Sequence, residues 1–342
     1  MMKNKHPHKP VPSKKKDLES SIQEFHCFLN QYQLILVTGH RAPDGDSIAT
    51  QLALGMILND LGKTVLIWGE ESIPDNFSFL KGKELWQSNK AFLQNDGVLC
   101  IVVDSPDIER VPSSLNEYVK KTNALVTIDH HISHTYYGNI NIVDIQASSC
   151  GEMLYDIFIS PDTHFSLDIA ECFYTSILTD TGGFRYRNTT PKALRIAAKL
   201  VEQGVLVEKV YNNVYGKVTV AKMKLFSSAL DTLFSSFDGK VIGIEITREM
   251  FDRCKAGSKD VDGFIDSLRL VGGVKIALLF FEADSGVIKV GFRSNDLRFD
   301  VNVIAQQFGG GGHPTASGAR IAGTLEGVKK VVLRAISAQF NL

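Results

Sequence analysis

Short apolar runs alternate with helical patterns along the first two thirds of the chain. The continuous, branched runs are typical of buried strands, and they lie at residues 34–38, 64–68, 98–103, 124–128 and 140–143. Apolar residues recur at helical spacing between and after them, and the predicted helices lie at 17–32, 47–61, 114–121, 149–159, 168–178 and from Pro191 onward. This alternation predicts an α/β domain over residues 17–205, with a mostly parallel sheet flanked by helices.

The pattern changes after residue 205. Residues 206–226 have mixed polarity and weak periodicity, which is typical of a partly helical linker. Beyond it, the predicted strands lie at 241–247, 274–282, 287–293 and 319–321, and the predicted helices near 221–236, 260–270, 301–308 and 325–340. We therefore expect a smaller domain with a mixed sheet over residues 227–342, and an active-site cleft between the two domains.

Composition sets outer limits on the class of protein. A chain of 342 residues exceeds a typical single core, and its net charge of −1 gives no global attraction for long nucleic acid. Residues 1–16 carry six lysines without an acidic residue or apolar periodicity, so we expect a disordered basic tail. No run reaches the roughly 18 apolar residues of a membrane span. The five cysteines are scattered and form no C-x-x-C, and we expect a cytoplasmic protein.

Metal-capable side chains follow three of the predicted strands. Side chains at the carboxyl ends of parallel strands meet at one edge of a sheet, where ligands bind. The candidates at this edge are His40, Asp44, Asp46, Asp104, Asp129, His130 and His131, and Asp180 follows a predicted helix. The sequence therefore predicts a metal site at that edge.

The number and type of these ligands indicate two ions. Carboxylates and imidazoles without a thiolate suit divalent ions, with Mn²⁺ the most natural choice and Mg²⁺ or Zn²⁺ as alternatives. Such a pair activates water and neutralises a phosphoryl group, so the predicted chemistry is phosphoester hydrolysis. Singly, Asp44 could instead cap a helix and Asp104 could be a turn residue. We expect Asp129 to orient a ligand histidine, and His134 and His164 to lie at the surface.

These motifs resemble those of the DHH/DHHA1 phosphoesterases over about residues 20–342. The matching segments are His40-x-x-x-Asp44-x-Asp46, Val103-Asp104-Ser105, Asp129-His130-His131, Thr179-Asp180-Thr181-Gly182 and Gly309-Gly310-Gly311-Gly312-His313. The resemblance implies one ion held by His40, Asp44 and Asp104, and a second held by Asp46, Asp104, His130 and Asp180. It also implies that Asp104 bridges the ions and that His131 contacts the scissile phosphate and assists the leaving group.

The layout is most similar to the nanoRNase/pAp-phosphatase branch, which trims very short RNA and converts 3′-phosphoadenosine 5′-phosphate (pAp) to AMP. Two further readings stay open: a cyclic or linear dinucleotide phosphodiesterase, and a non-catalytic nucleotide sensor. We expect short RNA or small nucleotides as partners, and neither long duplexes nor a membrane. Oligomeric state stays open between monomer and homodimer.

The second domain offers candidates for holding substrate. Four successive glycines precede His313, and such a run lets backbone N–H groups approach an anion closely. Arg293 follows a strand as a cation suited to phosphate. The resemblance assigns substrate binding to Arg293 and to the loop of Gly310, Gly311, Gly312 and His313. Arg185 lies shortly after Asp180, and the sequence leaves it between a substrate contact and an ordinary surface residue.

Overall fold

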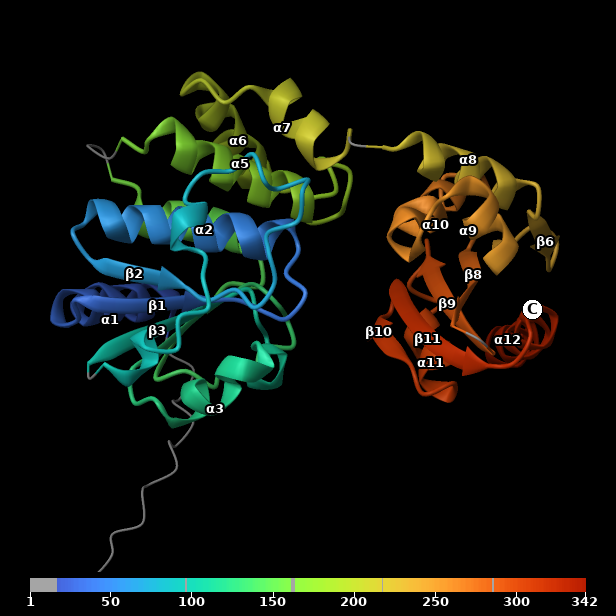
Figure 1. Cartoon of the computed structure of the whole chain (residues 1–342), viewed down its shortest axis with the longest axis horizontal. Helices are drawn as coiled ribbons and strands as arrows, with labels where there is room; N and C mark the ends of the chain where they lie inside the picture. The colour runs from blue at the N-terminus through green and yellow to red at the C-terminus, as the bar shows by residue number, and fades with distance from the viewer. Residues whose placement is uncertain (1–16, 96, 161–163, 217, 285) are drawn as a thin grey trace, which may run out of the picture. The chain divides into compact units, whose positions relative to one another are not determined.

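The computed structural model describes residues 17–342 apart from 96, 161–163, 217 and 285. The predicted basic tail, 1–16, lies outside the described residues. The chain divides into two compact units, Met1–Lys217 and Val218–Leu342, and this division falls within the predicted linker. Figure 1 shows the first unit in blue to yellow and the second in yellow to red.

The first unit is an α/β sandwich. Its sheet has the strand order β2-β1-β3-β4-β5 and every pairing in it is parallel. The strands are β1 (Leu34–Thr38), β2 (Thr64–Ile67), β3 (Val98–Val103), β4 (Leu125–Asp129) and β5 (Ile140–Val143). The helices are α1 (Leu18–Gln31), α2 (Gly45–Asp60), α3 (Ser113–Lys121), α4 (Cys150–Phe158), α5 (Leu167–Asp180), α6 (Pro191–Glu202) and α7 (Val207–Val214). The predicted parallel sheet with flanking helices is confirmed.

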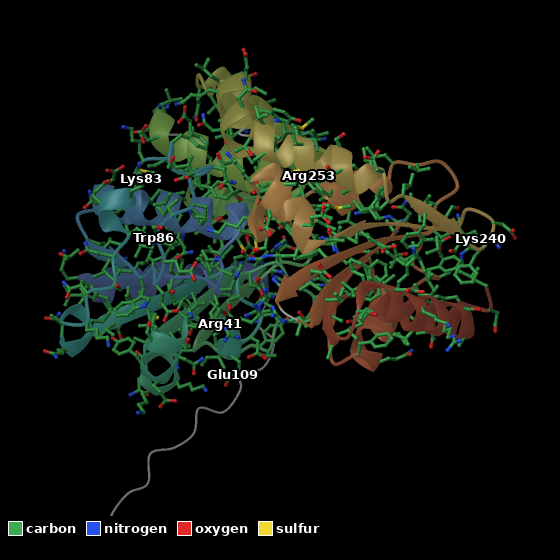
Figure 2. The ribbon with its side chains drawn as sticks, turned by 45° about the vertical axis from the view of Figure 1, so that its right-hand side comes forward. Arg41, Lys83, Trp86, Glu109, Lys240 and Arg253 are labelled. Carbon is green, nitrogen blue, oxygen red and sulfur yellow. The ribbon has the colours of Figure 1, made fainter. Side chains whose placement is uncertain are left out.

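Alternate strand residues face the two helical layers. Ile35 and Val37 of β1 join one core cluster with α1, α2, α4 and α5, whereas Leu36 joins another with α3. Burial on both faces explains why these strands read as continuous apolar runs. The segment between β2 and β3 carries two short 3₁₀ turns, η1 (Lys83–Leu85) and η2 (Phe92–Gln94). Trp86, labelled in Figure 2, anchors it by donating from Nε1 to the Glu71 carbonyl at 2.9 Å.

The second unit has a mixed sheet with the strand order β10-β11-β9-β8-β7-β6. Only β7 and β8 pair in parallel among its described strands. The strands are β6 (Phe234–Ser236), β7 (Val241–Ile246), β8 (Ile276–Asp284), β9 (Val287–Ser294), β10 (Gly311–His313) and β11 (Ala316–Ala322). The helices are α8 (Val220–Leu230), α9 (Arg248–Cys254), α10 (Phe264–Leu268), α11 (Val301–Gln307) and α12 (Leu325–Phe340). The predicted mixed sheet is confirmed.

Several local predictions in this unit were wrong. The helix predicted to reach residue 236 ends at Leu230, because residues 234–236 form β6 beside β7. The helix predicted near 260–270 is broken by Gly263, whose φ of 85° is left-handed. Helix α9 was not predicted at all. No helix in the described part of the chain combines the length and apolarity needed to span a membrane.

Candidate metal centre

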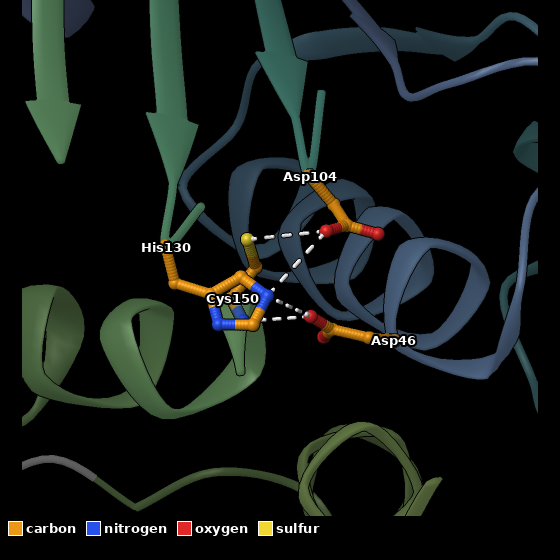
Figure 3. Close-up of side chains that lie close together, drawn as sticks. All are labelled: Asp46, Asp104, His130 and Cys150. Carbon is orange, nitrogen blue, oxygen red and sulfur yellow. Dashed lines mark hydrogen bonds and ion pairs between the residues drawn. The ribbon is translucent and has the colours of Figure 1, made fainter. Parts of the chain in front are cut away.

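Asp104 and the Asp129-His130-His131 segment lie side by side at the carboxyl ends of two neighbouring strands. Strand β3 ends at Val103 and its neighbour β4 ends at Asp129, so the two segments emerge at the same edge. Figure 3 shows Asp104 and His130 just beyond these two strands, facing Asp46 on α2. Asp104 has a φ of 54°, a left-handed conformation that a residue other than glycine seldom adopts. Strain of this kind is common at functional sites.

The two oxygens of Asp104 face different groups of ligand atoms. Oδ2 lies 3.3 Å from His40 Nε2, which is in turn 3.9 Å from Asp44 Oδ1. Oδ1 lies 3.8 Å from His130 Nε2. Donors placed about 2.1 Å from one ion lie up to about 4 Å apart, so both groups have suitable spacing. The structure thus brings together His40, Asp44 and Asp104 on one side of this carboxylate.

The second group centres on His130 Nε2. This atom lies 3.8 Å from Asp46 Oδ2 and 3.6 Å from Asp180 Oδ2, in addition to its approach to Asp104. His130 Nδ1 is 3.3 Å from the Ala147 carbonyl, and donation there leaves Nε2 with its lone pair toward the carboxylates. His40 is oriented in the same way, because its Nδ1 is 2.8 Å from the Arg41 carbonyl.

Burial and mutual proximity shift the pKa values of these groups. Burial, together with the charge of Asp46, raises the pKa of Asp104 to about 7. Burial and the charges of Asp46 and Asp44 raise the pKa of Asp180 to about 8. Burial opposes a charge on His40, yet its hydrogen bonds to Asp104 and Asp44 prevail and raise its pKa to about 10. Clustered buried carboxylates of this kind are stabilised by divalent cations, so the donor set fits metal ions.

Asp46 is held by donors from three helices. Its Oδ1 accepts from Thr50 Oγ1 at 2.9 Å and from Ser176 Oγ at 2.6 Å. The first backbone N–H groups of α4 also reach it, with Cys150 N 2.8 Å from Oδ2 and Gly151 N 3.3 Å from Oδ1. Ser149 caps this helix, since its Oγ accepts from Glu152 N at 3.1 Å. The carboxylate is therefore fixed in place, with Oδ2 still open toward His130.

His131 is oriented by Asp129 and borders the carboxylate cluster, since its Nδ1 also lies 3.7 Å from Asp104 Oδ1. Its Nδ1 donates to Asp129 Oδ1 at 2.8 Å, which leaves Nε2 free to carry a proton elsewhere. The side chain keeps 24% of its surface exposed, twice the 12% of His130. We predicted that Asp129 orients a ligand histidine; in the structure its hydrogen bond goes to His131.

His134 is buried, and the prediction that it lies at the surface was wrong. Its ring stacks on Tyr137 with centroids 5.4 Å apart, and its Nδ1 accepts from Tyr136 N at 3.0 Å. Tyr137 in turn donates to the Ser105 carbonyl at 2.9 Å, which ties this layer to the residue after Asp104. Burial lowers the pKa of His134, which favours the neutral form of the ring. His164 is exposed, as predicted.

Sequence reasoning missed three residues at the centre. The thiol of Cys150 lies 3.9 Å from Asp104 Oδ1 (Figure 3), and burial raises its pKa well above the usual value, so the thiol stays protonated. Asn188 donates from Nδ2 to Asp180 Oδ2 at 3.3 Å and to the Ser148 carbonyl at 3.0 Å. Arg41, the residue after His40, is an exposed cation. Its backbone N–H donates to the Arg110 carbonyl at 2.7 Å, and Figure 2 labels Arg41 together with Glu109, the residue before Arg110.

The candidate substrate-binding residues lie outside the carboxylate cluster. Arg185 is exposed and donates from Nε to the Gly182 carbonyl at 2.7 Å, two residues after Asp180. Arg293 is partly buried on β9, with its Nε 3.4 Å from Asp266 Oδ1. Gly311 and His313 form the ends of β10, and a Cβ on Gly310 or Gly312 would meet backbone oxygens of β11 at 2.1 and 2.4 Å. The close approach of the two strands therefore requires glycine at both positions, whatever their role toward a ligand.

Comparison with known proteins agrees with this architecture. The family model described as "DHH family, N-terminal domain" matches residues 34–177, and the DHHA1 domain model matches residues 246–341. A Thermus thermophilus protein named bifunctional oligoribonuclease and PAP phosphatase NrnA is 29% identical over 308 residues, covering 90% of each chain. A Bacillus subtilis protein of the same name is 28% identical over 297 residues, covering 86% of this chain and 91% of that one.

A solved structure shares the fold. The crystal structure of an exopolyphosphatase-related protein from Bacteroides fragilis superimposes with a TM-score of 0.88 at 24% identity, covering 94% of this chain and 97% of that one. Together, the two domain models account for the sheet that carries the carboxylate cluster and for the sheet that carries Arg293 and the glycine run. The chain belongs to the DHH/DHHA1 phosphoesterases.

Proposed function

We propose that this protein hydrolyses short RNA oligonucleotides to mononucleotides and converts pAp to AMP, as a phosphoesterase that uses two divalent ions. The observation that carries the proposal is the arrangement of Asp104, whose two oxygens face two separate groups of ligand atoms. A single bridging carboxylate is what a pair of closely spaced ions requires. The names of the Thermus and Bacillus relatives support the choice of substrates.

In this proposal one ion is held by His40, Asp44 and Asp104. The second is held by Asp46, Asp104, His130 and Asp180. DHH phosphoesterases are metal-dependent, and oxygen and imidazole donors favour Mn²⁺, with Mg²⁺ or Zn²⁺ as alternatives. When bound, the ions lower the pKa of water and neutralise charge on the phosphoryl group.

His131 supplies the proton that the leaving oxygen needs. Donation from Nδ1 to Asp129 fixes the ring, so that Nε2 is the atom that holds and transfers a proton. The Asp129 carboxylate holds the ring in one orientation, as the acid does in a histidine–aspartate pair. Stacked His134 and Tyr137 restrict the segment that follows His131. The chain's own contribution is therefore a fixed proton donor beside a fixed carboxylate cluster.

Substrate selection belongs to other residues in this proposal. Arg293, His313 and the backbone of Gly310, Gly311 and Gly312 bind the nucleotide away from the scissile phosphate, because charge-assisted donors suit phosphate and glycine leaves the backbone accessible. Arg185 contacts the substrate near Asp180. We also propose that the protein acts in the cytoplasm, since its five cysteines are free thiols.

The test is a turnover assay on purified protein with Mn²⁺. We expect release of AMP from pAp and of mononucleotides from labelled RNA, with rates that fall steeply as the RNA lengthens beyond a few nucleotides. Cyclic dinucleotides serve as a competing substrate: preferential cleavage of these would replace the proposal with a cyclic dinucleotide phosphodiesterase. Tight nucleotide binding without turnover under any of the three metals would identify a sensor and refute hydrolysis.

A further inference from the structure

Cys150 differs from the other buried cysteines in its surroundings. Cys100, Cys172 and Cys254 each belong to an apolar cluster, where a free cysteine serves as a small hydrophobic residue. Cys150 is fully buried but is a member of none of the four apolar clusters among the described residues. Its Sγ instead lies 3.9 Å from Asp104 Oδ1. Apolar packing therefore does not explain a cysteine at this position.

The sulfur completes a compact group of four possible metal ligands. One donor atom of each side chain lies within 4.8 Å of the other three, and the four residues are Asp46, Asp104, His130 and Cys150 (Figure 3). In a tetrahedral zinc site with bonds of about 2.0–2.3 Å, the ligand atoms lie roughly 3.3–3.7 Å apart. His130 Nε2 is 3.8 Å from both Asp46 Oδ2 and Asp104 Oδ1, so a small contraction of the group suffices. Asp180 approaches His130 Nε2 at 3.6 Å but is not a member of this group among the described residues.

The first turn of α4 holds the sulfur beside the carboxylates. Cys150 is the first residue of this helix, and its backbone N–H donates to Asp46 Oδ2 at 2.8 Å. Gly151 lets the helix approach α5 closely, because a Cβ there would overlap the Ser176 hydroxyl. The positive end of the helix dipole also favours an anionic sulfur. The sulfur and the Asp46 carboxylate are thus fixed relative to each other before any ion binds.

Asp104 needs a cation on the side of this thiol. The carboxylate is only 2% exposed, and burying a charged group is costly unless strong partners compensate it. Among the described residues, the hydrogen bond that reaches Asp104 Oδ1 comes from the Cys150 thiol at 3.9 Å, and a thiol is a weak donor. A divalent ion among the four donors neutralises Asp104 and Asp46 together.

We propose that a thiophilic divalent ion such as Zn²⁺ or Cd²⁺ binds at the second metal position with Cys150 as its fourth ligand, and that this ion inhibits hydrolysis. This inference rests on the proposed function, whose second ion the thiophilic ion displaces. The metal–sulfur bond forms as the thiol releases its proton to solvent, because a divalent ion deprotonates a coordinating thiol. Mn²⁺ and Mg²⁺ prefer oxygen and imidazole donors, so with them the sulfur stays outside the coordination sphere. Four protein ligands leave no open position for the attacking water.

The experiment uses Co²⁺ as a spectroscopic substitute for Zn²⁺. Metal-free, full-length protein is titrated with Co²⁺ under reducing conditions and without substrate. We expect a sulfur-to-cobalt charge-transfer band in the near ultraviolet, because one cysteine joins the coordination sphere. Competition with a chromophoric chelator then gives the dissociation constants of Zn²⁺ and Mn²⁺ for the same preparation.

Two substitutions of the cysteine are compared with a control at another thiol. Cys150→Ser and Cys150→Ala should both lose the band and bind Zn²⁺ about 100-fold more weakly, the effect of losing one of four ligands. Their affinity for Mn²⁺ should change little. Cys27→Ser removes an exposed thiol and should keep the band and the Zn²⁺ affinity of wild type. Melting temperatures in EDTA show whether each variant is folded.

Inhibition is measured on bis-p-nitrophenyl phosphate with Mn²⁺-loaded protein. Each rate with added Zn²⁺ is divided by the rate of the same variant in Mn²⁺ alone, so a change in basal turnover does not affect the comparison. Zn²⁺ should inhibit wild type and Cys27→Ser at far lower concentrations than Cys150→Ala.

The outcomes separate this inference from the proposed function. Wild-type protein that binds Co²⁺ without the band overturns the ligand role of Cys150, whether or not the variants fold, and leaves the two-ion proposal intact. A band that is lost in Cys27→Ser and kept in Cys150→Ala also overturns it. Undiminished turnover in Zn²⁺ under conditions that give the band with Co²⁺ overturns the inhibition. Protein that binds neither Co²⁺ nor Mn²⁺ overturns both proposals.

Discussion

His131 donates from Nδ1 to Asp129 Oδ1 at 2.8 Å, while its neighbour His130 directs Nε2 at three carboxylates. Two adjacent histidines, with ring centroids 4.7 Å apart, therefore present different ring nitrogens to their carboxylate partners. The proposed function assigns metal binding to His130 and proton transfer to His131, and each role can be tested by itself.

His131→Ala should retain metal and lose rate. Removal of a general acid typically lowers kcat by about 10²–10⁴-fold, since the proton must then come from water. Metal content by mass spectrometry and kcat on pAp are measured on the same preparation. His130→Ala is the matched control and should lose about one equivalent of metal. If His131→Ala is the variant that loses metal, the two roles have been exchanged.

Asp104→Asn should abolish tight binding of both ions. Asn is the preferred replacement because it tolerates the left-handed backbone at φ 54°, so the fold is preserved. Loss of the shared ligand should lower kcat/KM by at least about 10³-fold, comparable with the loss of a principal charge-stabilising group. Two ions retained at near-normal turnover would rule out the bridging role.

Arg293→Ala and His313→Ala should raise KM for pAp and dinucleotides by about 10- to 100-fold with little change in kcat. Bis-p-nitrophenyl phosphate has no distal nucleotide, so its hydrolysis should be nearly unaffected. Lys330→Ala, which removes an exposed cation from α12, provides the cation control. Equal losses on the nucleotide and the minimal ester would place these residues in the chemistry or point to misfolding.

The stabilising effect of Mn²⁺ should grow as pH rises from 6 to 8. Asp104, Asp180 and His40 have raised pKa values in the metal-free protein, at about 7, 8 and 10. The folded state then binds more protons than the unfolded chain, so its free energy of unfolding falls as pH rises through this range. Divalent ions bound at the cluster replace these protons, so the metal-bound protein does not lose this part of its free energy of unfolding as pH rises.

The measurement compares melting temperatures in Mn²⁺ and in EDTA at pH 6, 7 and 8. Titratable groups remote from the centre affect the melting temperature equally in Mn²⁺ and in EDTA, so their effects cancel in the difference. We expect the difference to widen by at least about 3 °C, roughly 1 kcal/mol for a unit of this size. A difference that is constant or narrows with pH would contradict the carboxylate cluster as the site of binding.

Sequence reasoning located the candidate centre because its residues follow strand ends. A buried parallel strand is recognisable from its apolar run, and β3 and β4 bring Asp104 and His130 to one edge by pairing alone. Cys150 and Ser176 were beyond reach, since helices α4 and α5 bring them to Asp46 through tertiary packing. No local pattern encodes that approach.

The burial of loop residues could not be predicted from the sequence either. His134 is a polar residue without periodic context, and only the stacking of Tyr137 and the N–H of Tyr136 remove it from water. The glycine run was recognised in the sequence, but its contribution to the structure was not. Gly310 and Gly312 are required by their close contact with β11, and the sequence predicted only three residues of that strand. Pairing partners of short strands depend on register, which composition does not specify.

The hydrogen bonds at Asp46 affect how an inactive variant should be made. Asp46→Ala would leave two N–H groups at the start of α4, and the hydroxyls of Thr50 and Ser176, without their acceptor in a buried site. Each stranded donor costs about 1–3 kcal/mol, so the variant would fail as a folded protein before it could report on catalysis. A substrate-trapping form for co-crystallisation with RNA is better built at His131, which has a single acceptor and lies at the exposed side of the cluster.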